Sequence, residues 1–163
     1  EGQRKLYLHP DGMLSYSGGA AEDGSRFAVA AADAAHISRA ELCAAARGLI
    51  GALTQGRSGD AALFLSGIES DDDDGATVFF DYMAGGTPIR FADGSHAAEV
   101  RIEGQSITAF SLRLRRYTLT ERDSLLLPLA LSRAIAQRYP GGELTVAYID
   151  SYGDSVGASW IAD

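Results

Sequence analysis

Hydrophobic and polar residues alternate most regularly in the stretch that follows Ser106. Apolar side chains occupy one set of alternate positions, Phe110, Leu112 and Leu114, and polar ones the other, Ser111, Arg113, Arg115 and Tyr117. This period of two predicts a strand with one buried and one exposed face. The polar face is either a solvated stripe or a docking surface, and exposed strand faces commonly carry charge without a binding role.

A helical period follows the strand. Apolar residues recur at this spacing at Leu127, Leu131, Ala134 and Ile135. Thr120 and Asp123 resemble a capping pair, and a start near Ser124 places Pro128 in the first turn, where proline is tolerated. The Tyr139–Gly142 stretch, which contains Pro140 and Gly141, is a stop signal.

The remaining pattern predicts hairpins around one more helix. Ser38 and Glu41 form a capping box before a helix that extends to Leu53. Gly48 and Gly51 in that helix indicate close packing, because glycine in a helix otherwise costs about 1 kcal/mol. Strands are predicted at 5–9, 13–17, 26–32, 61–68, 76–83, 98–103, 143–150 and 156–162, and residues 85–95 are expected to form turns and a loop.

The order of these elements indicates a duplication. The two helix caps, Ser38 and Thr120, lie 82 residues apart, and Val78 and Trp160 in the closing strands have the same separation. We therefore predict an α+β fold in which antiparallel sheets are each covered by one helix. The lobes would be residues 1–84 and 85–163, or parts of one continuous domain. The alternative is coincidence between two ordinary α+β segments.

Composition narrows the classes of function. The 163 residues suit one domain or two small lobes, and the net charge of -8 argues against nucleic-acid binding. The charge is uneven, with -7 in residues 1–82 and -1 in residues 83–163. Cys43 is the single cysteine, so no internal disulfide is expected. No apolar run reaches the roughly 18 residues of a membrane span. The chain begins at Glu1 without methionine, which we interpret as an ectodomain whose anchor was removed.

No motif in the sequence predicts catalysis. His9, His36 and His96 lack metal-ligand spacing, and the four aspartates at 71–74 lack the alternation of a calcium-binding loop. No nucleophile elbow or phosphate-binding loop occurs, and no carboxylate pair lies in an apolar setting. Cys43 lies beside the apolar side of the first helix and is interpreted as a packing residue. We therefore expect no enzyme activity, no cofactor and no metal.

The C-terminal half resembles the YycH/YycI family. The resemblance begins at Tyr82-Met83-Ala84-Gly85-Gly86-Thr87-Pro88-Ile89 and continues through residues 100–104, Ile107 to Phe110, Leu114 to Tyr117, Ala147-Tyr148 and Trp160-Ile161. It covers roughly residues 60–163. It implies a membrane-anchored, extracytoplasmic α+β protein of Gram-positive bacteria that binds a WalK-type sensor histidine kinase and a related regulatory protein. Members modulate the kinase and are not enzymes.

Three functions follow in order of preference. The first is a non-enzymatic regulatory domain that acts through protein contacts, with Arg113, Arg115 and Tyr117 as the candidate docking residues, since Arg and Tyr are enriched at binding hot spots. The second is a small ligand-binding or protease-inhibitor-like module with a groove lined by Phe80, Tyr82 and Trp160. The third is a hydrolase that uses scattered carboxylates.

Overall fold

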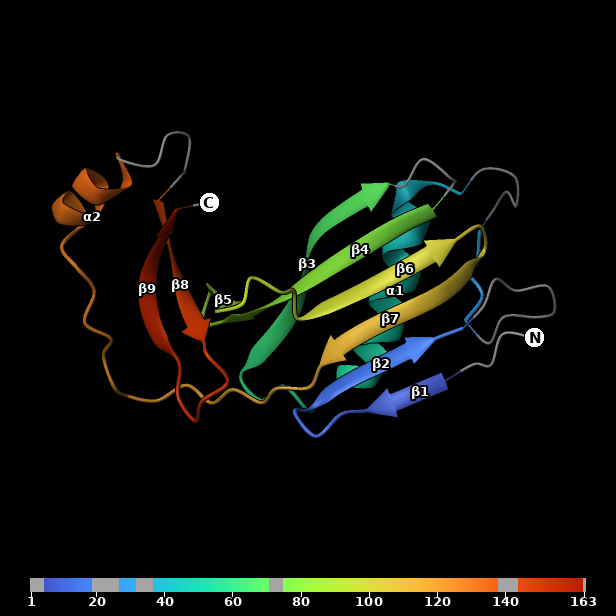
Figure 1. Cartoon of the computed structure of the whole chain (residues 1–163), viewed down its shortest axis with the longest axis horizontal. Coiled ribbons are helices and arrows are strands. Elements are labelled where there is room, and N and C mark those ends of the chain that lie inside the picture. Colours follow the sequence, from blue (N-terminus) through green and yellow to red (C-terminus); the bar gives the residue numbers. More distant parts are fainter. Residues whose placement is uncertain (1–4, 19–26, 32–36, 71–74, 138–143, 163) are drawn as a thin grey trace.

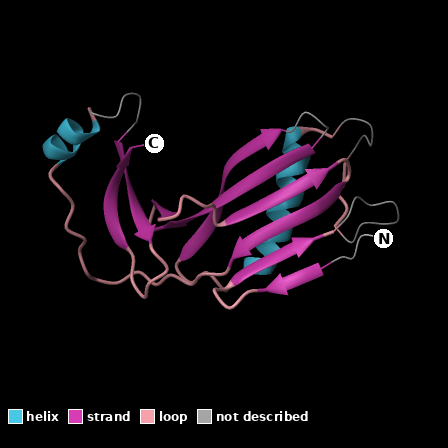
Figure 2. Ribbon diagram, in the orientation of Figure 1, coloured by secondary structure: helices cyan, strands magenta, loops and turns pink. Residues whose placement is uncertain are grey.

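One nine-stranded mixed sheet dominates the molecule (Figures 1 and 2). The computed structural model describes residues 5–18, 27–31, 37–70, 75–137 and 144–162. The strands are β1 (Lys5–Leu8), β2 (Met13–Ser17), β3 (Ala61–Ser70), β4 (Gly75–Ala84), β5 (Thr87–Phe91), β6 (Ala98–Glu103), β7 (Ser106–Arg113), β8 (Leu144–Asp150) and β9 (Gly157–Ala162). The helices are α1 (Arg39–Thr54) and α2 (Leu129–Ala136).

The sheet divides at β4. One edge of β4 pairs with β3 along its length. On the other edge, residues 75–80 pair with β6 and residues 82–84 pair with β5. The larger branch continues from β6 through β7 and β2 to β1, and the smaller branch continues from β5 through β8 to β9. Asp81 lies at the division, 1% exposed, and accepts hydrogen bonds from Arg90 and from the Ala97 amide.

The predicted fold class is wrong in its architecture. Instead of separate antiparallel sheets with one helix each, the chain forms a single sheet in which β5 and β8 pair in parallel. α1 packs on β3, β4 and β6, behind the larger branch in Figure 1. α2 packs mainly on β8. The predicted duplication of a strand, helix and hairpin unit fails with it, because the two helices do not play the same part.

α1 forms where the capping box predicted it. The Ser38 hydroxyl accepts from the Glu41 amide, and the Glu41 carboxylate accepts from the Ser38 amide. Its buried face brings Ala46 and Ile50 into one core with residues of the larger branch, including Val78, Val100, Phe110 and Leu112. The expectation of close packing at Gly48 and Gly51 is wrong, since a Cβ at either position would meet open space.

Three local predictions also fail. Residues 85–95 include a strand, β5, because Gly85 and Gly86 both adopt positive φ, +56° and +80°, and form a tight two-residue hairpin turn rather than a break. Pro128 caps α2, so no helix begins at Ser124 and Thr120 caps nothing. Of the predicted strand at 26–32, the described part shows one isolated bridge, between Ala28 and Ser106. The predicted stop at Tyr139–Gly142 and the aspartates at 71–74 lie outside the described residues.

The predicted lobe boundary falls in the turn between β4 and β5. Strands from both sides of it pair within the one sheet, β2 with β7 and β4 with β6. The hairpins β1–β2, β3–β4, β6–β7 and β8–β9 form as predicted, with ends that differ by one or two residues.

The loop between α1 and β3 holds the segment that follows β7. The Asp60 amide donates to the Tyr117 carbonyl at 2.8 Å, and the Tyr117 amide donates to the Ser58 carbonyl at 3.0 Å. Gly59 lies between them with φ of +69°, and a Cβ there would collide with the Tyr117 carbonyl oxygen. Glycine is therefore required here both by the backbone conformation and by the close approach of a second chain segment.

We predict that Gly59→Ala lowers the free energy of unfolding by roughly 3 kcal/mol, since it combines a left-handed backbone with a backbone clash. Gly56→Ala is the matched control: its φ is +67° but its Cβ would touch nothing. It should cost only about 1 kcal/mol. Urea unfolding of both variants checks this, and equal losses would show that the contact with Tyr117 contributes nothing.

Candidate protein-binding surface

The carboxylate of Asp150, at the end of β8, is fully buried and accepts four hydrogen bonds. Arg115 donates two of them, from Nε and Nη2, both at 2.9 Å. The Tyr117 hydroxyl donates at 2.8 Å and the Tyr152 amide at 2.7 Å. We call Arg115, Tyr117 and Asp150 the hairpin joint, because they tie the β8–β9 hairpin to the segment that leaves β7.

The hydrogen bonds of the hairpin joint favour one protonation state for Asp150 and one for Tyr117. Burial alone would raise the pKa of Asp150, but the hydrogen bonds from Arg115, Tyr117 and the Tyr152 amide outweigh it and leave that pKa below its ordinary value. Burial, helped by the hydrogen bond to Asp150, raises the pKa of Tyr117. At neutral pH the carboxylate is therefore ionised and the phenol protonated, the state that the donor geometry requires.

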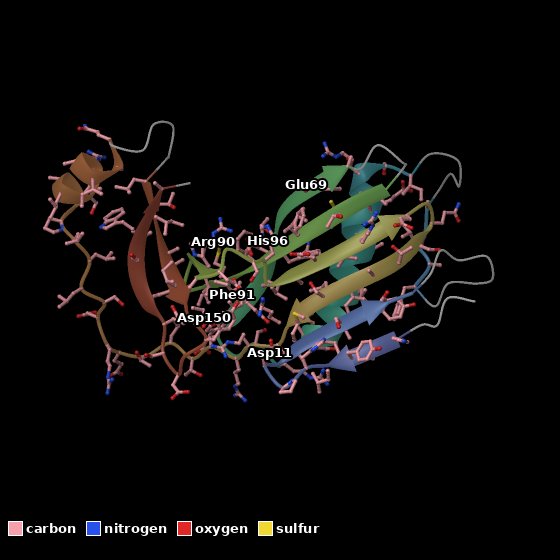
Figure 3. All side chains as sticks on the ribbon, in the orientation of Figure 1. Asp11, Glu69, Arg90, Phe91, His96 and Asp150 are labelled. Atoms are coloured by element: carbon pink, nitrogen blue, oxygen red, sulfur yellow. The ribbon has the colours of Figure 1, made fainter. Side chains whose placement is uncertain are left out.

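A second set of contacts surrounds the joint near the division of the sheet. The Arg113 guanidinium lies 5.4 Å from the Phe91 ring centroid and 5.1 Å from that of Tyr152, and it pairs with Asp93. The Tyr82 hydroxyl donates to the Arg113 carbonyl at 2.8 Å. Figure 3 shows Phe91 and Asp150 side by side where the two branches of the sheet meet, with Arg90 and His96 close to them.

The structure brings the three predicted docking residues together, but their polar groups turn toward the chain itself. Tyr117 is only 8% exposed, and the Arg113 and Arg115 side chains are 20% and 25% exposed. The alternation continues as predicted to Arg113, where β7 ends. Beyond Arg113 the chain leaves the sheet, and Tyr117 is buried, whereas the alternation predicted that it would be exposed to solvent. A role for the three residues in partner binding stays a prediction.

Most of the exposed aliphatic residues lie further along the chain. The connecting segment, residues 114–128, crosses from the hairpin joint to α2, and its residues from Thr118 onward are exposed. Between residues 125 and 135, six large aliphatic side chains are 38–101% exposed: Leu125, Leu126, Leu127, Leu129, Leu131 and Ile135. We call these six residues the leucine surface.

Two hydrogen bonds from β9 hold the connecting segment next to the leucine surface. The Trp160 indole donates to the Leu127 carbonyl at 2.8 Å, and the Ala158 amide donates to the Ser124 hydroxyl at 3.4 Å. The connecting segment is thus held at the hairpin joint and again along β9. The exposed leucines are therefore presented in a defined arrangement.

Two cavities separate the connecting segment from the hairpin. An apolar one of about 290 Å³ is lined mainly by leucine-surface residues and by Leu144 and Trp160. A more polar one of about 430 Å³ is lined by Arg115, Arg116, Arg122, Asp123 and Asp154, among others. Ala158 lines both cavities, and we call the two together the groove, with a polar end and an apolar end.

The other predicted site residues do not come together. Phe80 and Tyr82 are 2% and 1% exposed, so they lie in the core, whereas Trp160 lines the apolar cavity. His9 contacts Ser15, His96 contacts Asp81, and His36 lies outside the described residues. No group of side chains in the described part of the chain has the composition of a metal site. None of the described helices is both long and apolar enough to cross a bilayer.

Sequence reasoning missed the leucine surface because it assigned Leu127, Leu131 and Ile135 to the buried face of a helix. A signal was present in Leu125-Leu126-Leu127-Pro128. Three consecutive leucines cannot share one face of a helix, and the proline shortens the helix that was expected to bury them.

We predict that Asp150→Asn lowers the free energy of unfolding at pH 7 by about 3 kcal/mol, because it removes one partner of a buried ion pair. The folded-state pKa of Asp150 lies below its unfolded value, so its contribution is present above about pH 4 and is lost as the pH falls further. The difference from the wild type should therefore shrink under acid. Urea unfolding from pH 7 to pH 3 measures it, and a difference independent of pH would contradict the assignment.

Tyr117→Phe keeps the buried ring and removes only the hydroxyl that donates to Asp150. It should cost about 1–2 kcal/mol at pH 7. Tyr148→Phe on the same hairpin is the control, since the Tyr148 hydroxyl has no hydrogen-bond partner in the part of the chain that the structure describes. Its effect should stay within about 0.5 kcal/mol. Equal effects of the two substitutions would show that the Tyr117 hydroxyl contributes nothing to the stability of the joint.

Comparison with known proteins adds no relative. No family model, no curated protein and no solved structure matches this chain. The leucine surface and the groove beside it therefore carry the functional argument.

Proposed function

We propose that this chain is a protein-binding domain that docks its partner on the leucine surface. The resemblance to the YycH/YycI family supplies the candidate partners, namely the extracytoplasmic part of a WalK-type sensor histidine kinase and a related regulatory protein. In this proposal the domain is extracytoplasmic, is anchored to the membrane by a part of the protein outside residues 1–163, and modulates the kinase without catalysis. The observation that carries the proposal is the exposure of six aliphatic side chains within residues 125–135.

The number of exposed aliphatic side chains within this short stretch supports binding. Single exposed leucines are ordinary, but contiguous apolar patches on soluble proteins commonly mark interaction sites. Burying one such side chain yields about 1.5–3 kcal/mol, so several together can offset the cost of association. The backbone beneath them is already held by the contacts of Ser124 and Leu127 with β9, so binding orders little additional chain.

The charges around the surface indicate the chemistry of the partner. Arg116 and Arg122 are exposed at the polar end of the groove, and neither has an ion-pair partner among the described residues. The half of the chain that carries them has a net charge of -1, against -7 for the other half. Asp123 and Asp154 line the same cavity, so a partner with an apolar centre and charges of both signs at its rim fits this end of the molecule.

We predict that Leu125→Asp and Leu131→Asp each weaken binding to the purified kinase ectodomain by at least about tenfold. The two side chains are 101% and 49% exposed, so the substitutions should leave the fold intact. Biolayer interferometry with immobilised kinase ectodomain measures the affinity, and the related regulatory protein is tested in parallel.

Leu65→Asp is the matched control, because Leu65 is 46% exposed on β3, a strand that pairs only with β4 and belongs to neither proposed surface. It should bind like the wild type. If all three variants bind equally well, the leucine surface is not the docking site. If the wild type binds neither ectodomain, the kinase assignment fails while the surface remains open to another protein.

The polar cavity favours a second candidate, a small-ligand module. Its volume of about 430 Å³ lies within the range of known ligand sites, and arginine and aspartate side chains line it together. A thermal-shift screen with cell-wall fragments tests this candidate, and a ligand of the cavity should lose its stabilising effect in Arg122→Ala. Stabilisation retained in that variant would place the ligand elsewhere.

A further inference from the structure

The strand β1 forms one edge of the sheet. Natural proteins block edge strands with bulges, charges or covering segments, because exposed amides pair readily with another strand. Of the edge strands described, β3 carries a bulge at Leu65–Gly67 and its Ile68 carbonyl accepts from Arg39. β9 is contacted by the connecting segment through Ser124. Within the described residues β1 has no bulge and no covering segment, and its one charged side chain is that of Lys5, its first residue. β1 lies at the lower edge of the sheet in Figure 1.

The hydrogen bonds of the β1–β2 hairpin fix which β1 amides point outward. The His9 amide donates to the Met13 carbonyl, so His9 faces β2. Inward and outward positions alternate along an antiparallel strand, and Tyr7 and Lys5 therefore also face β2. The N–H and C=O groups of Leu6 and Leu8 point away from the sheet, and neither residue has another hydrogen-bond partner among the described residues.

The side chains of the same two residues are exposed apolar surface. Leu6 is 63% and Leu8 70% exposed. They lie opposite Tyr16 and Leu14, which pack against the main core, so they extend the core face beyond its last covered strand. Tyr7, on the opposite face, is 49% exposed. A strand added at this edge would thus satisfy two residues' backbone groups and cover two leucines together.

We propose that β1 pairs antiparallel with β1 of a second copy of this chain, about a twofold axis through Tyr7. Only this register pairs both outward residues, because it places Leu6 opposite the second copy's Leu8 and Leu8 opposite the second copy's Leu6. Each such pair exchanges two N–H···O bonds, and the four leucines lie together on one face. The interface is isologous and closes on itself, as twofold dimers do.

The charges at its ends and the small size of the interface determine the expected affinity of the dimer. The register places Lys5 opposite the second copy's His9, two residues before Asp11 in the turn, so opposite charges lie near each other at both ends. Two four-residue strands bury less than the roughly 1,200 Å² typical of stable complexes. The dimer should therefore be weak and reversible, and sedimentation equilibrium should show its population rising with protein concentration.

Cysteine cross-linking tests the register. In a Cys43→Ala background, Tyr7→Cys places two sulfurs on the twofold axis, where Cα atoms of a non-hydrogen-bonded pair lie about 4.5 Å apart. It should form a disulfide-linked dimer rapidly under mild oxidation. Leu6→Cys alone and Leu8→Cys alone should not, since each faces the other residue, but their mixture should give the mixed dimer. Equal cross-linking of all three single variants would indicate random collision and overturn the register.

Charge substitutions test the interface without cysteine. Leu6→Asp with Leu8→Asp should weaken self-association at least about tenfold, whereas Leu125→Asp, at the other end of the molecule, should leave it unchanged. A wild type that stays monomeric at every concentration overturns the proposal. So does a dimer that Leu125→Asp disrupts and the β1 variant does not. Binding to the kinase ectodomain is measured separately, so this proposal and the proposed function fail independently.

Discussion

The buried carboxylate of Asp150 decides how the C-terminal part of the chain is placed. β8 is joined to the rest of the sheet through three residue pairs with β5, a short and parallel contact. A fully buried carboxylate is tolerable only when every lone pair is satisfied, and here Arg115, Tyr117 and the Tyr152 amide supply the donors. The ion pair therefore fixes the hairpin and the segment after β7 relative to each other, because neither can move without leaving a charge unpaired.

This constraint explains why hydrophobic residues remain outside. The connecting segment leaves the joint at Tyr117 and is held again at Leu127, so it runs across the hairpin and does not fold back on the main core. α2 then begins at Leu129 and has only eight residues, too few for a stable isolated helix. Its leucines would need a second layer to bury them, and the sheet on this side offers only the narrow β8–β9 hairpin.

The sequence predicted what depends on neighbouring residues. The capping box at Ser38, the two-residue turn at Gly104 and the hairpins follow from spacing and turn chemistry within a few positions. The parallel pairing of β5 with β8 could not be predicted in this way, because the two strands lie more than fifty residues apart in the sequence and nothing in either segment indicates the other as its partner. Likewise the polar face of β7 was recognised, but the burial of Tyr117 in a cluster with Tyr82 and Ile89 was not. Its hydroxyl donates to Asp150, and nothing around Asp150 in the sequence indicates burial.

The two proposed surfaces lie at opposite ends of the molecule, with α2 beyond the smaller branch and β1 at the edge of the larger one (Figure 1). Occupying one therefore does not block the other. If β1 joins two copies, the dimer presents two leucine surfaces pointing away from the axis, and a partner that is itself twofold can engage both. The second contact is then intramolecular and gains from effective concentration, so weak self-association and moderate affinity at each surface together suffice for tight binding. A weak edge contact is in this way consistent with a binding role, because it lets the partner's concentration decide whether the dimer forms.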